Sequence, residues 1–144
     1  MPRSSLARRV VIDTNVLFEG LTKQGGASGL IIDAWSVGLV NTCVSNALAY
    51  EYADVLSRKL SIHRWEIIKP VLGRLLDRAQ FTSIYYTWRP SSPDPGDEHI
   101  IDCAMNAGAT VVTLNRRDFQ RATRTLGLKL LTPVAFVHSL ADEH

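Results

Sequence analysis

Three acidic residues, Asp13, Glu51 and Asp97, stand beside segments whose pattern favours apolar side chains. Carboxylate oxygens are the ligands that Mg²⁺ and Mn²⁺ prefer, whereas no two histidines have the helical spacing of a zinc site. Carboxylates that gather in one pocket repel one another, and bound divalent cations relieve that cost. The three acids therefore suggest a site for Mg²⁺ or Mn²⁺.

Asp13 and Glu51 each have a second, purely structural interpretation. Asp13 ends the strand-like run 10–12, so it either binds a metal or caps the helix that follows. Glu51 borders the apolar face of a helical pattern, where it either reaches a metal or pairs with Arg58. Its neighbour Asp54 lies on a more polar side and is expected in solvent. The pattern alone leaves both alternatives open.

Asp97 is polar at a position where the helical pattern predicts an apolar residue. At about 100° per residue, it falls near the centre of the face formed by Ile100, Ile101 and Ala104. It also lies in the first turn, where the helix dipole favours a negative charge, so capping is the competing interpretation. Asp102 falls on the opposite, polar face, and we expect it to be an ordinary surface residue.

A fourth polar position follows the apolar run 111–114. Asn115 and Asp118 are both candidates for it, although Asp118 is equally suited to capping a short helix. Four arginines nearby either bind the phosphates of RNA or form a solvated face. These are Arg116, Arg117, Arg121 and Arg124.

Strand-like and helix-like patterns alternate along the chain. Short runs rich in apolar, aromatic or β-branched residues predict strands at 10–12, 42–44, 81–86, 111–114 and 129–131. Helical patterns lie between or after them at 28–39, 46–59, 63–78, 97–107 and 133–141, and Gly108 ends the fourth. The alternation predicts an α/β domain with a mostly parallel sheet, in which ligands bind beyond the carboxyl ends of the strands.

Length and composition narrow the class of protein. A chain of 144 residues with 46% hydrophobic residues predicts a single domain over residues 1–144. We find no apolar run that would span a membrane and no signal peptide in residues 1–9, so we expect a cytoplasmic protein. Cys43 and Cys103 fit reduced core thiols. Basic residues gather at 3–9, 58–64 and 116–124, which favours contact with nucleic acid.

Four blocks of the sequence resemble the PIN-domain family of nucleases. They are VVIDTNVL at 10–17, SNALAYEYADVL at 45–56, DPGDEHII at 94–101 and TLNRRDF at 113–119. They follow one another in the family's order and extend from residue 9 to about residue 119. The resemblance implies a three-layer α/β fold in which helices flank a mostly parallel sheet of four or five strands.

The resemblance also implies roles for individual residues. It assigns metal binding to Asp13, Glu51 and Asp97 and supporting polar roles to their neighbours. The neighbours are Thr14, Asn15 and Thr113. Asn115 stands where many relatives have an aspartate, and Asp118 follows three residues later, so either residue is a candidate for the fourth ligand. Many family members are toxins of bacterial toxin–antitoxin pairs, which implies a protein antitoxin as a partner.

Together, the acids and the resemblance predict metal-dependent hydrolysis of RNA phosphodiester bonds by attack of water. The resemblance implies products with 5′-phosphate and 3′-hydroxyl ends. A small-molecule phosphohydrolase with Asp13 as nucleophile is disfavoured, because such enzymes carry an acid where this chain has Asn15. A non-catalytic RNA-binding or protein-interaction module is the second alternative. A surplus of apolar residues in 63–78 suggests a homodimer.

Overall fold

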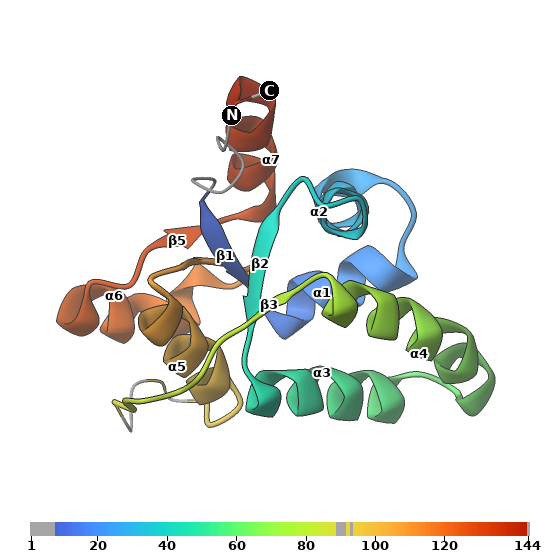
Figure 1. The fold of residues 1–144 in the computed structure, drawn as a ribbon, viewed down its shortest axis with the longest axis horizontal. Coiled ribbons are helices and arrows are strands. Elements are labelled where there is room, and N and C mark those ends of the chain that lie inside the picture. Colours follow the sequence, from blue (N-terminus) through green and yellow to red (C-terminus); the bar gives the residue numbers. More distant parts are fainter. Residues whose placement is uncertain (1–7, 89–91, 93, 144) are drawn as a thin grey trace.

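The computed structural model describes residues 8–88, 92 and 94–143. In these residues the strands form a five-stranded parallel sheet in the order β3-β2-β1-β4-β5 (Figure 1). The strands are β1 (Arg9–Ile12), β2 (Asn41–Val44), β3 (Gln80–Phe81), β4 (Thr110–Val112) and β5 (Leu130–Leu131). The predicted α/β fold with a parallel sheet is confirmed.

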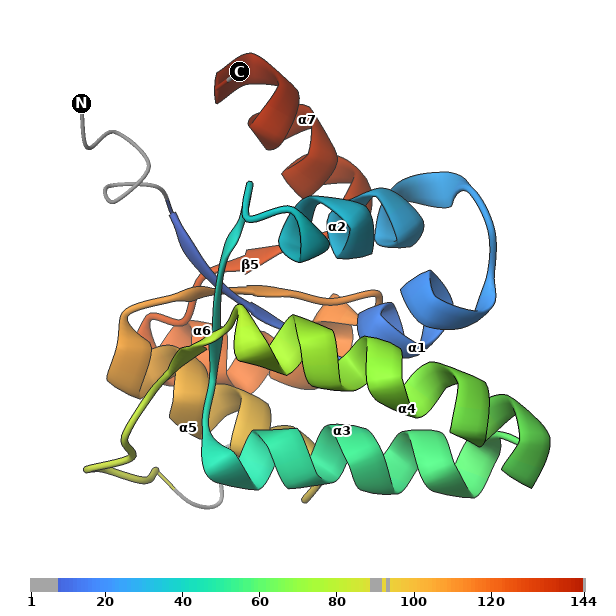
Figure 2. The same ribbon diagram turned by 45° about the vertical axis from the view of Figure 1, so that its right-hand side comes forward.

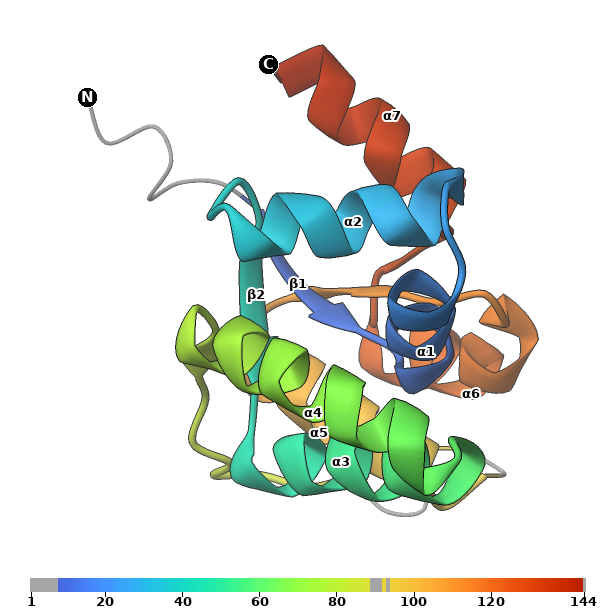
Figure 3. The same ribbon diagram turned by 90° about the vertical axis from the view of Figure 1, so that its right-hand side faces the viewer.

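Helices cover both faces of the sheet. They are α1 (Thr14–Thr22), α2 (Gly26–Ser36), α3 (Asn46–Lys59), α4 (Ile62–Asp77), α5 (Asp97–Ala107), the 3₁₀ helix η2 (Arg116–Phe119), α6 (Gln120–Leu126) and α7 (Pro133–Glu143). Helix α5 contacts β1, β2 and β4 from one side, and Figure 3 shows α1 and α2 in front of the strands on the other. In the described part of the chain, every helix is too short or too polar to cross a membrane.

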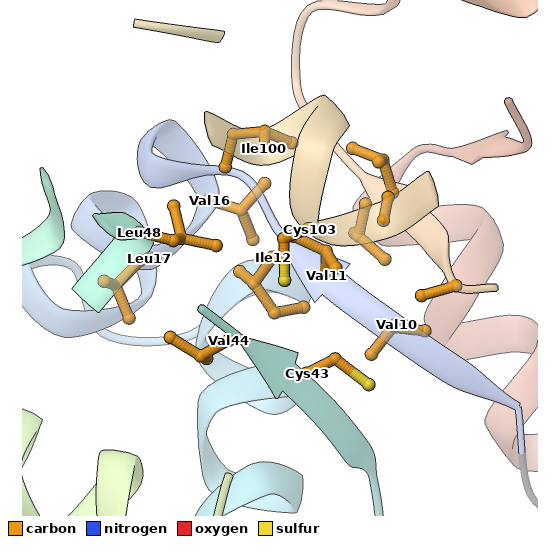
Figure 4. Close-up of a cluster of buried hydrophobic side chains, with 14 of the residues drawn as sticks. Val10, Val11, Ile12, Val16, Leu17, Cys43, Val44, Leu48, Ile100 and Cys103 are labelled. Atoms are coloured by element: carbon orange, nitrogen blue, oxygen red, sulfur yellow. The ribbon is translucent and has the colours of Figure 1, made fainter. Parts of the chain in front are cut away.

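The continuous apolar runs are explained by burial on both faces. Val10, Val11 and Ile12 of β1 are fully buried, which requires protein on each side of the sheet. Figure 4 shows side chains from β1, β2, α1, α3 and α5 gathered in this core. Cys43 and Cys103 lie within it as free thiols, as predicted, and burial raises the pKa of Cys103 to about 12.

The strand predicted at 81–86 is wrong in extent, because β3 ends at Phe81. The Thr82 amide still donates to the Val44 carbonyl, but β2 also ends at Val44 and offers no further partner. Further along the chain, the amides of Tyr85 and Tyr86 donate to the Asn106 side chain of helix α5. We call residues 82–88 the strap; Figure 2 shows it in yellow-green beside α5.

Asp102 was expected at the surface and is instead 3% exposed. Helix α3 packs against α5, and the strap is bonded to Asn106, one turn after Asp102. The polar face of α5 is therefore covered by other parts of the chain. Glu98, on the same face, is buried for the same reason.

Several helix boundaries also differ from the prediction, most clearly those of α1 and α2. Helix α1, for which the sequence pattern gave no bounds, begins at Thr14, directly after β1. Helix α2 ends at Ser36 rather than at residue 39, because Gly38 adopts a positive φ of 83° that turns the chain toward β2. The bounds predicted for α3 and α5 are confirmed.

Candidate metal centre

The candidate site lies at the carboxyl edge of the sheet, where β1 and β4 end side by side. Parallel pairing of Ile12 with Val112 brings Asp13 next to Thr113, and the Asp13 amide donates to the Val112 carbonyl at 2.9 Å. The buried Thr113 hydroxyl donates to Asp13 Oδ2 at 2.7 Å and accepts from the Asn115 amide at 3.0 Å. Its proton is thus committed to the Asp13 carboxylate, which fixes that side chain.

Asp13 does not act as a conventional helix cap. It occupies the N-cap position of α1, yet its side chain makes no capping hydrogen bond. Burial raises the pKa of Asp13, and the negative charges of Asp118 and Asp94 raise it further. Hydrogen bonds from Thr113 and the Thr14 backbone oppose this shift. The carboxylate therefore carries an electrostatic cost that a cation would remove.

Asp97 is the centre of an acidic cluster. One carboxylate oxygen from each of Asp94, Asp97 and Asp118 lies within 4.8 Å of the others. Burial raises the pKa of Asp97 to about 7, and the charges of Asp13, Asp94 and Asp118 contribute to the shift. Burial and the neighbouring acids thus outweigh the helix dipole, which would lower the pKa of Asp97. Asp97 also makes no side-chain cap in this helix.

Of the two candidates for the fourth polar position, Asp118 belongs to the acidic cluster and Asn115 contacts it. The Asn115 amide nitrogen donates to Asp118 Oδ2 at 2.9 Å, so Asn115 orients the carboxylate. Phe119, the next residue, is fully buried and anchors η2 to the core. The alternative role of Asp118 as a cap is not observed, since α6 begins after Phe119 without a side-chain cap.

Glu51 lies at the rim of the cluster. Its neighbour Tyr52 is fully buried and donates its hydroxyl proton to the Ile12 carbonyl, which fixes α3 against the end of β1. A Cβ on Gly96 would lie 3.5 Å from Glu51 Oε2 and 3.4 Å from Asp94 Oδ1, so the two acids flank this glycine. Arg58, the alternative partner of Glu51, pairs with the exposed Asp54 instead.

Two residues of the site, Ser92 and Asp94, were missed by the sequence reasoning. Ser92 is 5% exposed, and its hydroxyl lies 3.4 Å from Asp97 Oδ2 and 3.3 Å from the Asp118 carbonyl, while accepting from the Asp94 amide at 3.2 Å. Asp94 Oδ1 accepts from the Gly96 amide at 2.9 Å. The one available signal was the Asp-Pro-Gly turn, which places an acid three residues before Asp97.

Replacement of Ser92 by alanine is expected to weaken Mn²⁺ binding by about 10- to 100-fold, because partners that orient a ligating carboxylate have effects of this size. Calorimetric titration of the purified protein with Mn²⁺ measures the change. Ser92→Thr retains the hydroxyl and should recover most of the affinity. Equal affinities for wild type and Ser92→Ala would contradict the orienting role.

The remaining predicted residues surround the cluster. Asn15 Oδ1 accepts from the Leu114 amide at 3.4 Å and so supports the turn after β4. Thr14 contributes its backbone amide to Asp13. The predicted phosphate-binding arginines are all exposed, on η2 and α6, in the segment that carries Asp118. They are Arg116, Arg117, Arg121 and Arg124.

Comparison with known families bears on this arrangement. A family model for the PIN domain matches residues 9–117. The chain belongs to the PIN-domain family. The match includes Asp13, Glu51 and Asp97, but it ends one residue before Asp118. A search of curated protein sequences finds no match.

Solved structures support the same fold for this PIN domain. VapBC2 from Rickettsia felis, bound to a DNA fragment from its promoter, has a TM-score of 0.63 at 17% identity over 86% of this chain and 98% of the other. FitAcB from Neisseria gonorrhoeae has a TM-score of 0.61 at 18% identity over 87% and 98%. PAE2754 from Pyrobaculum aerophilum has 0.60 at 14% over 94% and 90%.

The residues of this PIN domain fit a divalent cation. PIN domains are generally nucleases, and the donors gathered here are carboxylate oxygens, which suit Mg²⁺ and Mn²⁺. Burial first, and then the charges of Asp13, Asp94 and Asp118, raise the pKa of Asp97, so a bound cation would favour its ionised form.

Proposed function

We propose that this PIN domain is a Mg²⁺- or Mn²⁺-dependent endoribonuclease that hydrolyses RNA phosphodiester bonds. The observation that carries the proposal is the convergence of Asp13, Asp94, Asp97 and Asp118 at the carboxyl edge of the sheet. Each of the other three raises the pKa of Asp97, so all four share one electrostatic environment. A site of this charge does not attract a polyanion by itself, and a bound cation reverses its local sign.

In this proposal the acids differ in role. Asp94, Asp97 and Asp118 would hold the cation together with Asp13, and Glu51 would act from the rim beside Gly96. Thr113 and Asn115 hold Asp13 and Asp118 in place through the hydrogen bonds described above. Bound cations would supply a lower pKa for the attacking water and stabilisation of the leaving oxygen.

The arginines of η2 and α6 bind the RNA phosphates that flank the scissile bond. They are exposed, and they belong to the same short segment as Asp118. Phosphate contacts of this kind position the backbone without reading sequence. The proposed nuclease therefore selects RNA by access to its backbone, which favours single-stranded or looped regions.

We further propose that the protein is the toxin of a toxin–antitoxin pair, acts in the cytoplasm and has a protein antitoxin as partner. The likeness to VapBC2 and FitAB, both of which were solved bound to DNA fragments, supports a partnership of this kind. Ile62 and Ile67 on α4 are 80% and 59% exposed, which supports a homodimer through this helix. Light scattering of the purified chain measures that association.

The nuclease proposal is tested with end-labelled single-stranded RNA and purified protein. Cleavage is expected with Mg²⁺ or Mn²⁺ and none with EDTA, and the new ends should be 5′-phosphate and 3′-hydroxyl. Asp13→Asn should be inactive, whereas Asp54→Asn, an exposed acid on α3 outside the cluster, should match wild type. RNA binding without metal-dependent cleavage would indicate a non-catalytic module. Acid-stable phosphate on Asp13 would indicate a small-molecule phosphohydrolase.

A further inference from the structure

The strap carries aromatic side chains beside the C-terminal part of helix α5, where it bonds to Asn106, about 14 Å along the helix axis from Asp97. Tyr85 is 80% exposed and Tyr86 is 69% exposed. The rings of Tyr86 and Trp88 are neighbours, with centroids 6.2 Å apart and planes inclined by 44°. None of these three residues belongs to the hydrophobic core. Large exposed aromatic groups of this kind mark interaction sites.

The backbone of the strap is fixed even though its rings are exposed. Asn106 Oδ1 accepts from the Tyr85 amide at 2.9 Å and from the Tyr86 amide at 3.2 Å. The Asn106 amide nitrogen donates to the Tyr86 carbonyl at 2.8 Å. One side chain on α5 thus satisfies three backbone groups of the strap. The rings are presented on a preorganised backbone, which lowers the entropic cost of binding a ligand.

The strap leads along the chain to Ser92 and Asp94 of the candidate site. Trp88 precedes Ser92 by four residues, so their Cα atoms lie at most about 14 Å apart. Ser92 in turn lies 3.4 Å from Asp97. Single-strand binding sites on small domains cover about 4–16 nucleotides, so one bound strand can reach both the rings and the acids. Figure 2 shows the strap descending along α5 toward the end of the helix that carries Asp97.

We propose that Tyr85, Tyr86 and Trp88 form a stacking platform for unpaired bases of the RNA whose backbone enters the acidic cluster. This inference rests on the proposed nuclease function and adds the residues that would bind the unstacked bases of its single-stranded substrate. Aromatic rings stack on any base, so the platform tolerates different sequences. A duplex hides the faces of its bases within its own stack and is excluded.

The test measures binding separately from cleavage. Fluorescence anisotropy in EDTA, at constant salt, compares a 12-nucleotide single-stranded RNA with an abasic oligonucleotide that keeps the phosphates and loses the bases. Wild type is expected to prefer the RNA with bases. Tyr85→Ala and Tyr86→Ala should each weaken binding of that RNA by roughly 5- to 100-fold and leave abasic binding unchanged. Tyr86→Trp keeps a stacking surface and should retain the preference.

Val134→Ala is the matched control, because Val134 is 59% exposed on α7, away from the strap (Figure 1). It should bind both oligonucleotides as wild type does. Equal binding of the two oligonucleotides by wild type, or unchanged binding by both tyrosine variants, would overturn the platform. So would a loss of self-association in the tyrosine variants with RNA binding intact, which would assign the rings to a protein interface.

The two proposals fail in distinguishable ways. If the protein cleaves RNA with metal but binds both oligonucleotides equally, the proposed nuclease function is supported and the platform is refuted. If the protein prefers the RNA with bases but does not cleave it with Mn²⁺, the nuclease function is refuted and the platform is supported.

Discussion

Asp97→Asn is expected to lower metal-dependent RNA cleavage by about 100- to 1,000-fold while it raises the melting temperature of the metal-free protein. Activity falls because a cation loses a charged ligand at the centre of the cluster. Stability rises because asparagine removes a negative charge that is desolvated by burial and also repelled by Asp13, Asp94 and Asp118. Melting temperature should rise by about 2–4 °C for each kcal/mol of this cost removed.

The sign of the stability change follows from the direction of the pKa shift. The pKa of Asp97 is raised from 3.8 to about 7 in the folded, metal-free protein, so between these values the folded state binds more protons than the unfolded chain. The contribution of Asp97 to the free energy of unfolding is therefore fully favourable below pH 4 and is lost as pH rises through about 7. The stabilising effect of Asp97→Asn should grow over this range and then level off.

Thermal unfolding in EDTA at several pH values measures this difference, and Asp54→Asn serves as the control because Asp54 is exposed and pairs with Arg58. Addition of Mn²⁺ should reverse the order of stability, since the cation stabilises wild type more than Asp97→Asn. A variant that is less stable than wild type without metal at pH 8 would show that burial and repulsion of the Asp97 charge do not dominate the effect of the substitution.

Phe119→Ala is expected to lower the free energy of unfolding by about 3–5 kcal/mol, because it leaves a cavity where a fully buried aromatic ring stood. It should also weaken Mn²⁺ binding, although Phe119 is not itself a ligand. Asp118 precedes Phe119 in η2, and its position depends on how that helix is anchored. Urea unfolding gives the first effect, and Mn²⁺ titration at a temperature where the variant stays folded gives the second.

Phe119→Leu retains most of the buried volume and should show a smaller loss in both measurements. Gln120→Ala, an exposed change beside it, should have almost no effect on either. Weak Mn²⁺ binding by Phe119→Ala with an unchanged free energy of unfolding would contradict the anchoring role.

Elements with a strong local pattern were predicted well. Helices α3 and α5 have the predicted bounds, because each combines a long apolar stripe with local end signals, such as Ser45, whose side chain caps α3, and Gly108, which ends α5 with φ 64°. The predicted sheet is correct because continuous apolar runs are stable as strands only when both faces are covered. The bounds of helix α1 were not predicted, because it follows β1 with no intervening loop.

Features that depend on contacts between distant segments were not predictable in this way. The burial of Asp102 depends on α3 and on the strap, whose residues all lie more than a dozen positions before Asp102 in sequence. The strap itself leaves the strand conformation because β2 is too short to pair with it. The sequence left open whether Asn115 or Asp118 joins the acids. In the structure Asp118 lies in the cluster, and Asn115 donates a hydrogen bond to it.

The sequence alone determined the class of fold and the family, because periodicity and residue type can be read without coordinates. It identified Asp13, at the end of a buried strand, and Asp97, on the apolar face of a helix, as candidate metal ligands. Only the tertiary structure decided which acids share one electrostatic field, and it added Ser92 and Asp94 from a loop that has no periodic pattern. The reason is that Coulomb interactions and hydrogen bonds depend on distance in space, which folding sets independently of distance along the chain.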